Sequence, residues 1–216
     1  MTKKNKLISI LLIAIFCVLY ITLSVFIAVN GNASTGADDW FFNTFVLGVR
    51  CDFWTWFYKI FTYLGSIYAL IVVCLLVVIF CKNKKIKLFS AINLAVVSIG
   101  NLLIKFILQR PRPSVNIIAE TGFSFPSGHT MMSMAFYGLL IYFIIKFCKN
   151  KPLKILSSIL ISVIIVMIAY SRIYLGVHYF TDIIGGFMLG GVVLLLTIIF
   201  FNIKYKKEKQ DLNLKQ

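Results

Sequence analysis

The sequence predicts an all-α integral membrane protein, a bundle of six transmembrane helices with an interfacial helix on its outer side. Hydrophobic residues make up 60% of the 216 residues, and the mean hydropathy of +0.94 exceeds what a soluble core needs. A helix needs roughly 20 apolar residues to cross a hydrocarbon layer of about 30 Å. The segments that approach or exceed this length are 7–29, 60–81, 88–108, 128–146, 155–176 and 180–201.

The first of these segments also has features of a secretory signal, because lysines precede its apolar stretch. That stretch runs for about 23 residues, whereas a signal core has roughly 7–15, so we expect an uncleaved first helix. Residues 30–39 are polar and predict a loop. All three tryptophans fall within 40–58, and such aromatic residues favour the lipid headgroup level, which predicts the interfacial helix there.

The net charge of +15 raises the question of nucleic-acid binding, and the distribution of the cations answers it. With the N-terminus in the cytoplasm, sixteen cations lie on the inner side, including the basic tail over about 203–216. The other six are Arg50, Lys59, Lys105, Arg110, Arg112 and Arg172. This positive-inside bias places both termini of a multi-pass protein in the cytoplasm. We therefore expect one membrane-embedded domain over 1–216, with the bilayer and not nucleic acid as its partner.

Three short motifs contain both histidines of the chain. They are Lys105-x6-Arg112-Pro113, Pro126-Ser127-Gly128-His129 and Ser171-Arg172-x5-His178-x3-Asp182. Ionisable side chains are costly in a membrane, so their presence there indicates function. The predicted topology places all three motifs at the outer ends of helices, where Pro111 and Pro113 end the third span. We expect them to meet in one extracytoplasmic site.

The residue types in these motifs suit phosphoryl chemistry. Ser127 opens a helix, and the amides of Ser127, Gly128 and His129 at that positive terminus favour an anion. Gly128 also allows a phosphate to approach the backbone closely. Three cations can stabilise the charge that develops on a transferred phosphoryl group.

The last motif provides a candidate nucleophile. His178 and Asp182 are four residues apart, so on a helix the carboxylate can hold one ring nitrogen and leave the other free to attack. Arg172 lies six residues before His178 and would point away from it on a continuous helix. We therefore expect the chain to turn near Gly176.

Together the motifs resemble the three-part signature of the type 2 phosphatidic acid phosphatase family, at every signature position and in the same order and spacing. The resemblance implies that His178 forms a phosphohistidine, that Asp182 orients it and that His129 protonates the departing oxygen. It also implies a set of phosphate-binding residues, namely Lys105, Arg112, Ser127, Gly128 and Arg172.

Few carboxylates are available to hold a metal. Asp182 is the only acid within the six predicted transmembrane spans, and Glu120 is the only one in the loop 109–126. Two-metal phosphatases need several carboxylates, and the five scattered cysteines show no metal spacing. We therefore expect a phosphatase with no metal and no other cofactor.

A site at the outer headgroup level predicts a membrane-anchored phosphomonoester or diphosphate as substrate. Phosphatidylglycerophosphate, phosphatidic acid and undecaprenyl diphosphate all fit. Some polyprenyl-diphosphate members of the family carry Asp where Gly128 stands, which favours a glycerophospholipid. Two other functions compete: vanadium haloperoxidases share the motifs but are soluble, and a binder or transporter of lipid phosphates would not need a nucleophile.

Overall fold

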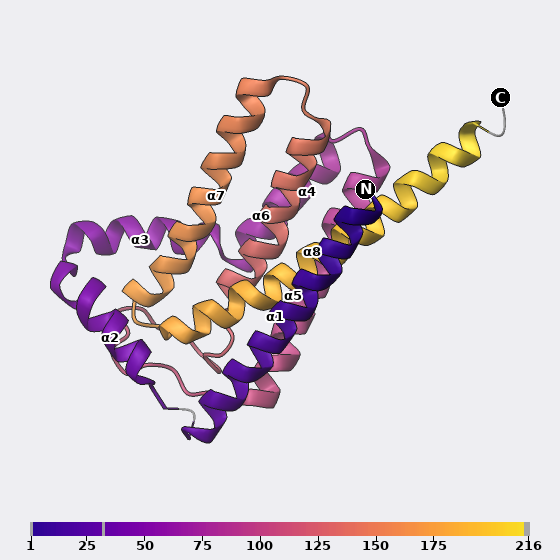
Figure 1. The fold of residues 1–216 in the computed structure, drawn as a ribbon. Helices are drawn as coiled ribbons and strands as arrows, with labels where there is room; N and C mark the ends of the chain where they lie inside the picture. Colours follow the sequence, from indigo (N-terminus) through magenta and orange to yellow (C-terminus); the bar gives the residue numbers. More distant parts are fainter. Residues whose placement is uncertain (1, 32, 214–216) are drawn as a thin grey trace.

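The computed structural model describes residues 2–31 and 33–213, and all regular elements in this part of the chain are helical. The elements are α1 (Lys3–Val29), α2 (Gly36–Phe45), the short 3-10 helix η1 (Leu47–Val49), α3 (Asp52–Leu64), α4 (Ile67–Phe80), α5 (Lys84–Leu108), α6 (Gly128–Phe147), α7 (Lys151–Tyr174) and α8 (Phe180–Asn213). Both termini lie at one end of the bundle, whereas α2 and the loops that follow α5 and α7 lie at the other (Figure 1). The all-α prediction is confirmed.

Five helices, α1, α5, α6, α7 and α8, are long and apolar enough to cross a membrane. The predicted span 60–81 is not one helix, because α3 and α4 meet at a bend of 50° and qualify as a span only together. Gly65 ends α3, and the Ser66 hydroxyl caps α4 by accepting from the Ala69 amide at 3.2 Å. Counted as one broken span, this pair completes the six that the sequence predicts.

The predicted interfacial helix over 40–58 is also divided, into α2 and α3, with η1 between them. Helix α2 begins earlier than expected, inside the predicted loop 30–39, because Thr35 and Asp38 form a capping box. The Asp38 amide donates to the Thr35 hydroxyl at 3.3 Å, and the Thr35 amide donates to the Asp38 carboxylate at 2.9 Å. Both helices lie across the end of the bundle opposite the termini (Figure 1).

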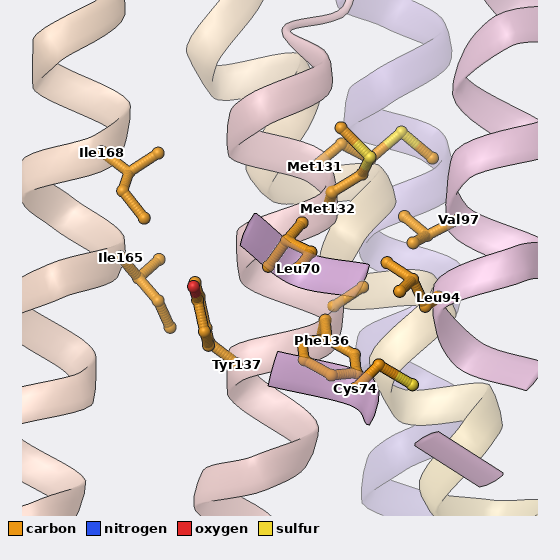
Figure 2. Close-up of a cluster of buried hydrophobic side chains, with 11 residues drawn as sticks. Leu70, Cys74, Leu94, Val97, Met131, Met132, Phe136, Tyr137, Ile165 and Ile168 are labelled. Carbon is orange, nitrogen blue, oxygen red and sulfur yellow. The ribbon is translucent and has the colours of Figure 1, made fainter. Parts of the chain in front are cut away.

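Helix α6 lies at the centre and packs against α4, α5, α7 and α8. Figure 2 shows the main apolar cluster around it, formed by Leu70, Cys74, Leu94, Val97, Met131, Met132, Ala135, Phe136, Tyr137, Ile165 and Ile168. Helix α8 approaches the α6 backbone closely at Gly190, where an added Cβ would lie 2.6 Å from the Met131 carbonyl oxygen. Small residues allow such backbone contact between membrane helices. The packing fixes the position of the first turn of α6, which carries Gly128 and His129.

Helix α8 continues past its apolar part as far as Asn213. The side chains after Lys206 and residues 214–216 lie outside the described part of the chain. Most of the basic tail predicted over 203–216 therefore lies outside it as well.

Candidate active site

The three motifs meet at the end of the bundle that is opposite the termini. There α5 ends, α6 begins and the chain turns from α7 into α8. A cavity of about 410 Å³ at this point is lined by six of the eight predicted residues, namely Lys105, Arg112, Gly128, His129, Arg172 and His178. The other two, Ser127 and Asp182, are fully buried and do not line it.

The turn between α7 and α8 brings Arg172 and His178 to the same cavity. Gly176 adopts a φ of +71°, and the His178 amide donates back to the Arg172 carbonyl at 3.3 Å. An added Cβ on Gly176 would lie 2.4 Å from the Val115 carbonyl oxygen, so a side chain has no room there. The predicted turn near Gly176 is confirmed.

His178 is held between Asp182 and Arg112. Its Nδ1 lies 3.2 Å from Asp182 Oδ2, which also accepts from the Tyr179 amide at 2.9 Å. Helix α8 begins only at Phe180, so His178 precedes the helix, and the spacing of four residues still brings the pair together. On the other side of the ring, Nε2 lies 3.3 Å from Arg112 Nη1.

This contact assigns the tautomer of His178. A guanidinium can only donate hydrogen bonds, so Nε2 must carry a lone pair and the ring proton must sit on Nδ1, facing Asp182. Burial first, and then the nearby cations Arg172, Lys105 and Arg112, hold the pKa of His178 well below its usual value. The imidazole is therefore neutral at pH 7, with its unprotonated nitrogen at the cavity.

Backbone carbonyls of the loop before α6 hold two of the predicted cations. Lys105 Nζ donates to the Phe123 carbonyl at 2.8 Å. Arg112 donates to the Gly122 carbonyl at 3.1 Å and to the Thr121 carbonyl at 3.0 Å. Burial lowers the pKa of the Arg112 guanidinium, and Glu120 and Asp182 oppose that shift. An arginine stays protonated through such a shift, so Arg112 presents its donors at the cavity.

Arg172 is almost fully buried and forms an ion pair with Glu120. It also donates to the Thr62 hydroxyl of α3. The other carboxylate oxygen of Glu120 lies 3.7 Å from Arg112 Nη2, so one acid is placed between two of the three cations. An anionic group therefore already lies where the sequence predicts phosphate.

The N-terminus of α6 differs from the prediction at Ser127. Its amide donates to the Asp182 carbonyl at 3.0 Å, so it is engaged within the protein and is not free for phosphate. This bond ties the first turns of α6 and α8 together. The Gly128 and His129 amides remain in the first turn of α6, and an added Cβ on Gly128 would lie 2.7 Å from Asn101 Oδ1.

His129 borders two cavities. Besides the first, it lines a cavity of about 570 Å³ whose wall includes Tyr63 and Ile67 from either side of the bend between α3 and α4. Arg172 and Glu120 also line both cavities. The bend packs directly on the histidine, since an added Cβ on Gly65 would lie 3.2 Å from His129 Cδ2.

Sequence reasoning missed three charged residues around the site: Arg110, Asp38 and Glu120. Arg110 is fully buried between Asp38 and Asp182, whereas the charge distribution predicts only that it lies on the outer side. The sequence does contain one signal for these residues. Only seven acidic residues occur in the chain, so each one is a candidate partner for a buried cation. A buried cation needs one of them as a partner.

No group of three or more histidine, cysteine or acidic residues in the described part of the chain is arranged to hold a metal ion. The metal-independent mechanism remains a prediction. Chelation of metals in an activity assay tests it.

Comparison with known proteins gives a family for this site. The PAP2 superfamily model matches residues 85–206, more than half of the chain. Phosphatidylglycerophosphatase B of Bacillus subtilis is 37% identical over 115 residues, which cover 51% of this chain and 55% of that protein. Undecaprenyl-diphosphatase of Sulfolobus acidocaldarius is 29% identical over 142 residues, covering 62% and 64% of the two chains. The chain thus spans under two thirds of the length of these relatives.

The fold agrees with these matches. The crystal structure of a transmembrane PAP2-type phosphatidylglycerolphosphate phosphatase from Bacillus subtilis superposes with a TM-score of 0.77 at 28% identity. The superposition covers 87% of this chain and 94% of the other. All three motifs lie within the residues that the family model matches. The chain therefore belongs to the PAP2 superfamily.

Proposed function

We propose that the protein is a metal-independent lipid phosphatase that works through a phosphohistidine at the extracytoplasmic face of the cell membrane. One observation carries the proposal. The unprotonated Nε2 of His178 lies 3.3 Å from Arg112 Nη1, and both residues line a cavity that Lys105 and Arg172 also line. A site that only bound phosphate would need the cations but not a neutral imidazole backed by a buried carboxylate.

In the first step of the proposed reaction, His178 Nε2 attacks phosphorus and the bond from phosphorus to the lipid oxygen breaks. His129 gives a proton to that oxygen, and the lipid leaves as an alcohol or as a phosphate. The His178 ring becomes positively charged, and Asp182 stabilises this charge through the proton on Nδ1. The three cations stabilise the charge on the transferred oxygens.

In the second step, water attacks the phosphohistidine. His129, which lost its proton in the first step, takes one from the water as the new bond to phosphorus forms. The bond from phosphorus to Nε2 breaks, and inorganic phosphate leaves with His178 again neutral. The same histidine thus acts as acid in one step and as base in the other.

The two cavities that meet at His129 suit the two parts of such a substrate. We place the phosphoryl group in the cavity of about 410 Å³, which contains the cations and His178. The neighbouring cavity of about 570 Å³ then receives the lipid side of the scissile bond, among side chains such as Tyr63, Ile67 and Ile118. His129 stands between them, where the departing oxygen needs its proton.

A bound phosphate must displace Glu120 from Arg172. A phosphate group carries more negative charge than a carboxylate and offers more acceptor oxygens, so it can compete for both Arg112 and Arg172. The carboxylate that pairs with these cations in this structure therefore supports an anion-binding role for them.

A glycerophospholipid such as phosphatidylglycerophosphate or phosphatidic acid is the proposed substrate. The name of the Bacillus subtilis relative, phosphatidylglycerophosphatase B, supports it. Undecaprenyl diphosphate is the alternative, and the name of the Sulfolobus acidocaldarius relative favours it. Both substrates present a phosphate at the headgroup level on an apolar anchor.

Phosphate release by the detergent-purified protein tests the proposal and ranks the substrates. Phosphatidylglycerophosphate, phosphatidic acid and undecaprenyl diphosphate are compared at equal surface concentration, with and without excess EDTA, and with H178A as the control. We expect release from at least one lipid, unchanged by EDTA and absent in the variant. If the protein binds a lipid but releases no phosphate, it is a binder or transporter and not a phosphatase. If EDTA abolishes phosphate release and Mg²⁺ restores it, the metal-independent mechanism is wrong.

A further inference from the structure

A line of buried charges extends behind Asp182, away from the cavity. Arg110 is fully buried and donates from Nη1 to Asp182 Oδ1 at 2.7 Å. From Nη2 it donates to Asp38 Oδ2 at 2.8 Å. Its guanidinium also lies over the ring of Tyr179, at 4.1 Å from the centroid. Arg110 thus joins the carboxylate that holds His178 to a second carboxylate from a distant part of the chain.

Asp38 reaches this network from the first turn of α2. Asp38 is 3% exposed, and it contacts α8 as well as Arg110. Asp38 Oδ1 accepts from the Thr181 amide at 2.8 Å, and Oδ2 accepts from the Thr181 hydroxyl at 3.1 Å. Asp38 lies outside residues 85–206, which the family model matches, so the three motifs do not include it.

Because Arg110 pairs with both Asp38 and Asp182, it contacts only one carboxylate oxygen of Asp182 and leaves the other for His178. Asp182 Oδ1 pairs with Arg110, while Oδ2 faces His178 Nδ1 and the Tyr179 amide. Without Asp38, Nη2 of Arg110 keeps, among the described residues, only the Ala33 carbonyl as a partner, at 2.8 Å, and the guanidinium could turn to form a bidentate pair with both oxygens of Asp182. Arg110 would then compete with His178 for Oδ2.

The formal charges of the network also match the proposed reaction. Asp38, Arg110 and Asp182 together carry a net charge of −1. When His178 becomes an imidazolium in the phosphoenzyme, the group of four becomes neutral. In a buried site this balance stabilises the charged intermediate more than the free enzyme.

We propose that Asp38 and Arg110 are positioning residues, which keep Asp182 Oδ2 directed at His178 and so speed phosphoryl transfer without contacting the substrate. The inference rests on the proposed function. It assigns to α2, which lies outside the matched family region, a part in the chemistry.

Asp38 also has a purely structural role, since it belongs to the capping box of α2 and accepts from the start of α8. Two control variants separate the roles. T35A removes the Thr35 hydroxyl, which accepts from the Asp38 amide and donates to Asp38 Oδ2 at 2.9 Å, but it keeps the Asp38 carboxylate and its charge opposite Arg110. D39N makes the same charge change on the next residue, which is exposed.

The experiment compares D38N with these controls in the full-length protein in detergent, on whichever lipid the wild type hydrolyses. The measurements are kcat, KM, the rate of phosphoenzyme formation in a single turnover, and the thermal unfolding temperature. We expect D38N to lower kcat and the phosphorylation rate about 10- to 100-fold, the range for groups that orient a reactive side chain from behind. KM should stay within about twofold, because the phosphate-binding cations are unchanged.

T35A should lower the unfolding temperature as D38N does but keep kcat near the wild-type value, and D39N should change neither. The inference is overturned if D38N keeps the wild-type kcat, or if T35A loses as much kcat as D38N does. If D38N does not fold, R110K decides, because its ammonium keeps the buried charge but cannot bridge both acids as a planar guanidinium does. If R110K lowers kcat and leaves KM unchanged, the inference is supported. If R110K keeps the wild-type kcat, or changes only KM, the inference is overturned.

The wild-type measurement keeps the two proposals apart. If the wild type releases no phosphate from any of the three lipids, the proposed function itself fails. If the wild type is active and the variants behave like their controls, only the role of Asp38 and Arg110 fails.

Discussion

His178 is prepared as a nucleophile by the groups that surround it. Asp182 accepts a hydrogen bond from the Nδ1 proton, and the cations near Nε2 oppose a second proton, so the neutral tautomer with an unprotonated Nε2 is stabilised. Burial acts in the same direction, because a charged imidazole loses more on leaving water than a neutral one. The fold around His178 thus keeps the nucleophile unprotonated.

The low pKa of His178 leads to a prediction about pH dependence. A histidine with its usual pKa of about 6.5 would lose about threefold in its neutral fraction between pH 7 and pH 6. Because His178 has a pKa well below that value, it stays neutral over this interval, and activity should be lost only at lower pH. The measurement is the rate of phosphoenzyme formation from p-nitrophenyl phosphate between pH 7 and pH 6, in the H129A variant so that the other histidine does not titrate. A threefold decrease that coincides with protonation of the His178 ring, followed by its ¹⁵N resonances, would contradict the assignment.

Residues in the motifs were easier to predict than those that support them. The spacing of His178 and Asp182 and the turn near Gly176 follow from local geometry, and both are present. Arg110 and Asp38 are 72 residues apart and pair only after α2 docks on α8. No local pattern marks such a pair, because a lone arginine in an outer loop has the same sequence signal whether it is buried or exposed.

At the scale of elements, the contact between α6 and α8 depends on glycines. An added Cβ on Gly190 would lie 2.6 Å from the Met131 carbonyl oxygen, and backbone cannot move aside as a side chain can. This contact lies about two turns along α8 from Asp182, and it positions the first turn of α6, which carries His129.

We therefore predict that G190A destabilises the protein by about 1–3 kcal/mol, the usual cost of overpacking. Thermal unfolding in detergent gives the change in stability. G100A is the control, since its methyl group would meet nothing closer than 3.9 Å. Equal unfolding temperatures for the two variants would show that the close contact of α6 and α8 does not limit stability.

The bend between α3 and α4 shows why hydropathy alone misplaced an element. Residues 60–81 are apolar enough to read as one span, and the sequence contains no proline there. The break is marked by Gly65, which ends α3, and by Ser66, whose hydroxyl caps α4; the missing side chain at Gly65 also lets Ile168 of α7 pack closely, because an added Cβ would lie 2.4 Å from Ile168 Cγ2. The length of an apolar segment predicts that the chain crosses the membrane, but capping residues decide where it bends.

At the scale of the whole molecule, the distribution of cations predicts which side of the membrane holds the site. Sixteen of the 22 lysines and arginines fall in the segments assigned to the cytoplasm. Ser114 is exposed in the loop that carries Arg112, and Lys149 is exposed in the loop between α6 and α7.

We predict that a cysteine at Ser114 reacts with a membrane-impermeant thiol reagent in intact cells, in a background whose five native cysteines are replaced. A cysteine at Lys149 should react only after the membrane is made permeable. The opposite pattern would invert the topology and place the active site on the cytoplasmic leaflet.

The most direct test of the account is to trap and locate the phosphoenzyme. The protein is mixed with a phosphate-labelled substrate, quenched within one turnover and mapped by mass spectrometry. We predict a phosphohistidine at residue 178 that is absent in H178A with every substrate. In H129A the loss, about 10²–10⁴-fold with a lipid, should shrink with p-nitrophenyl phosphate, whose departing oxygen needs no proton. A label on residue 129, or rescue of H178A but not H129A by that ester, would show that the nucleophile and the acid have been assigned the wrong way round.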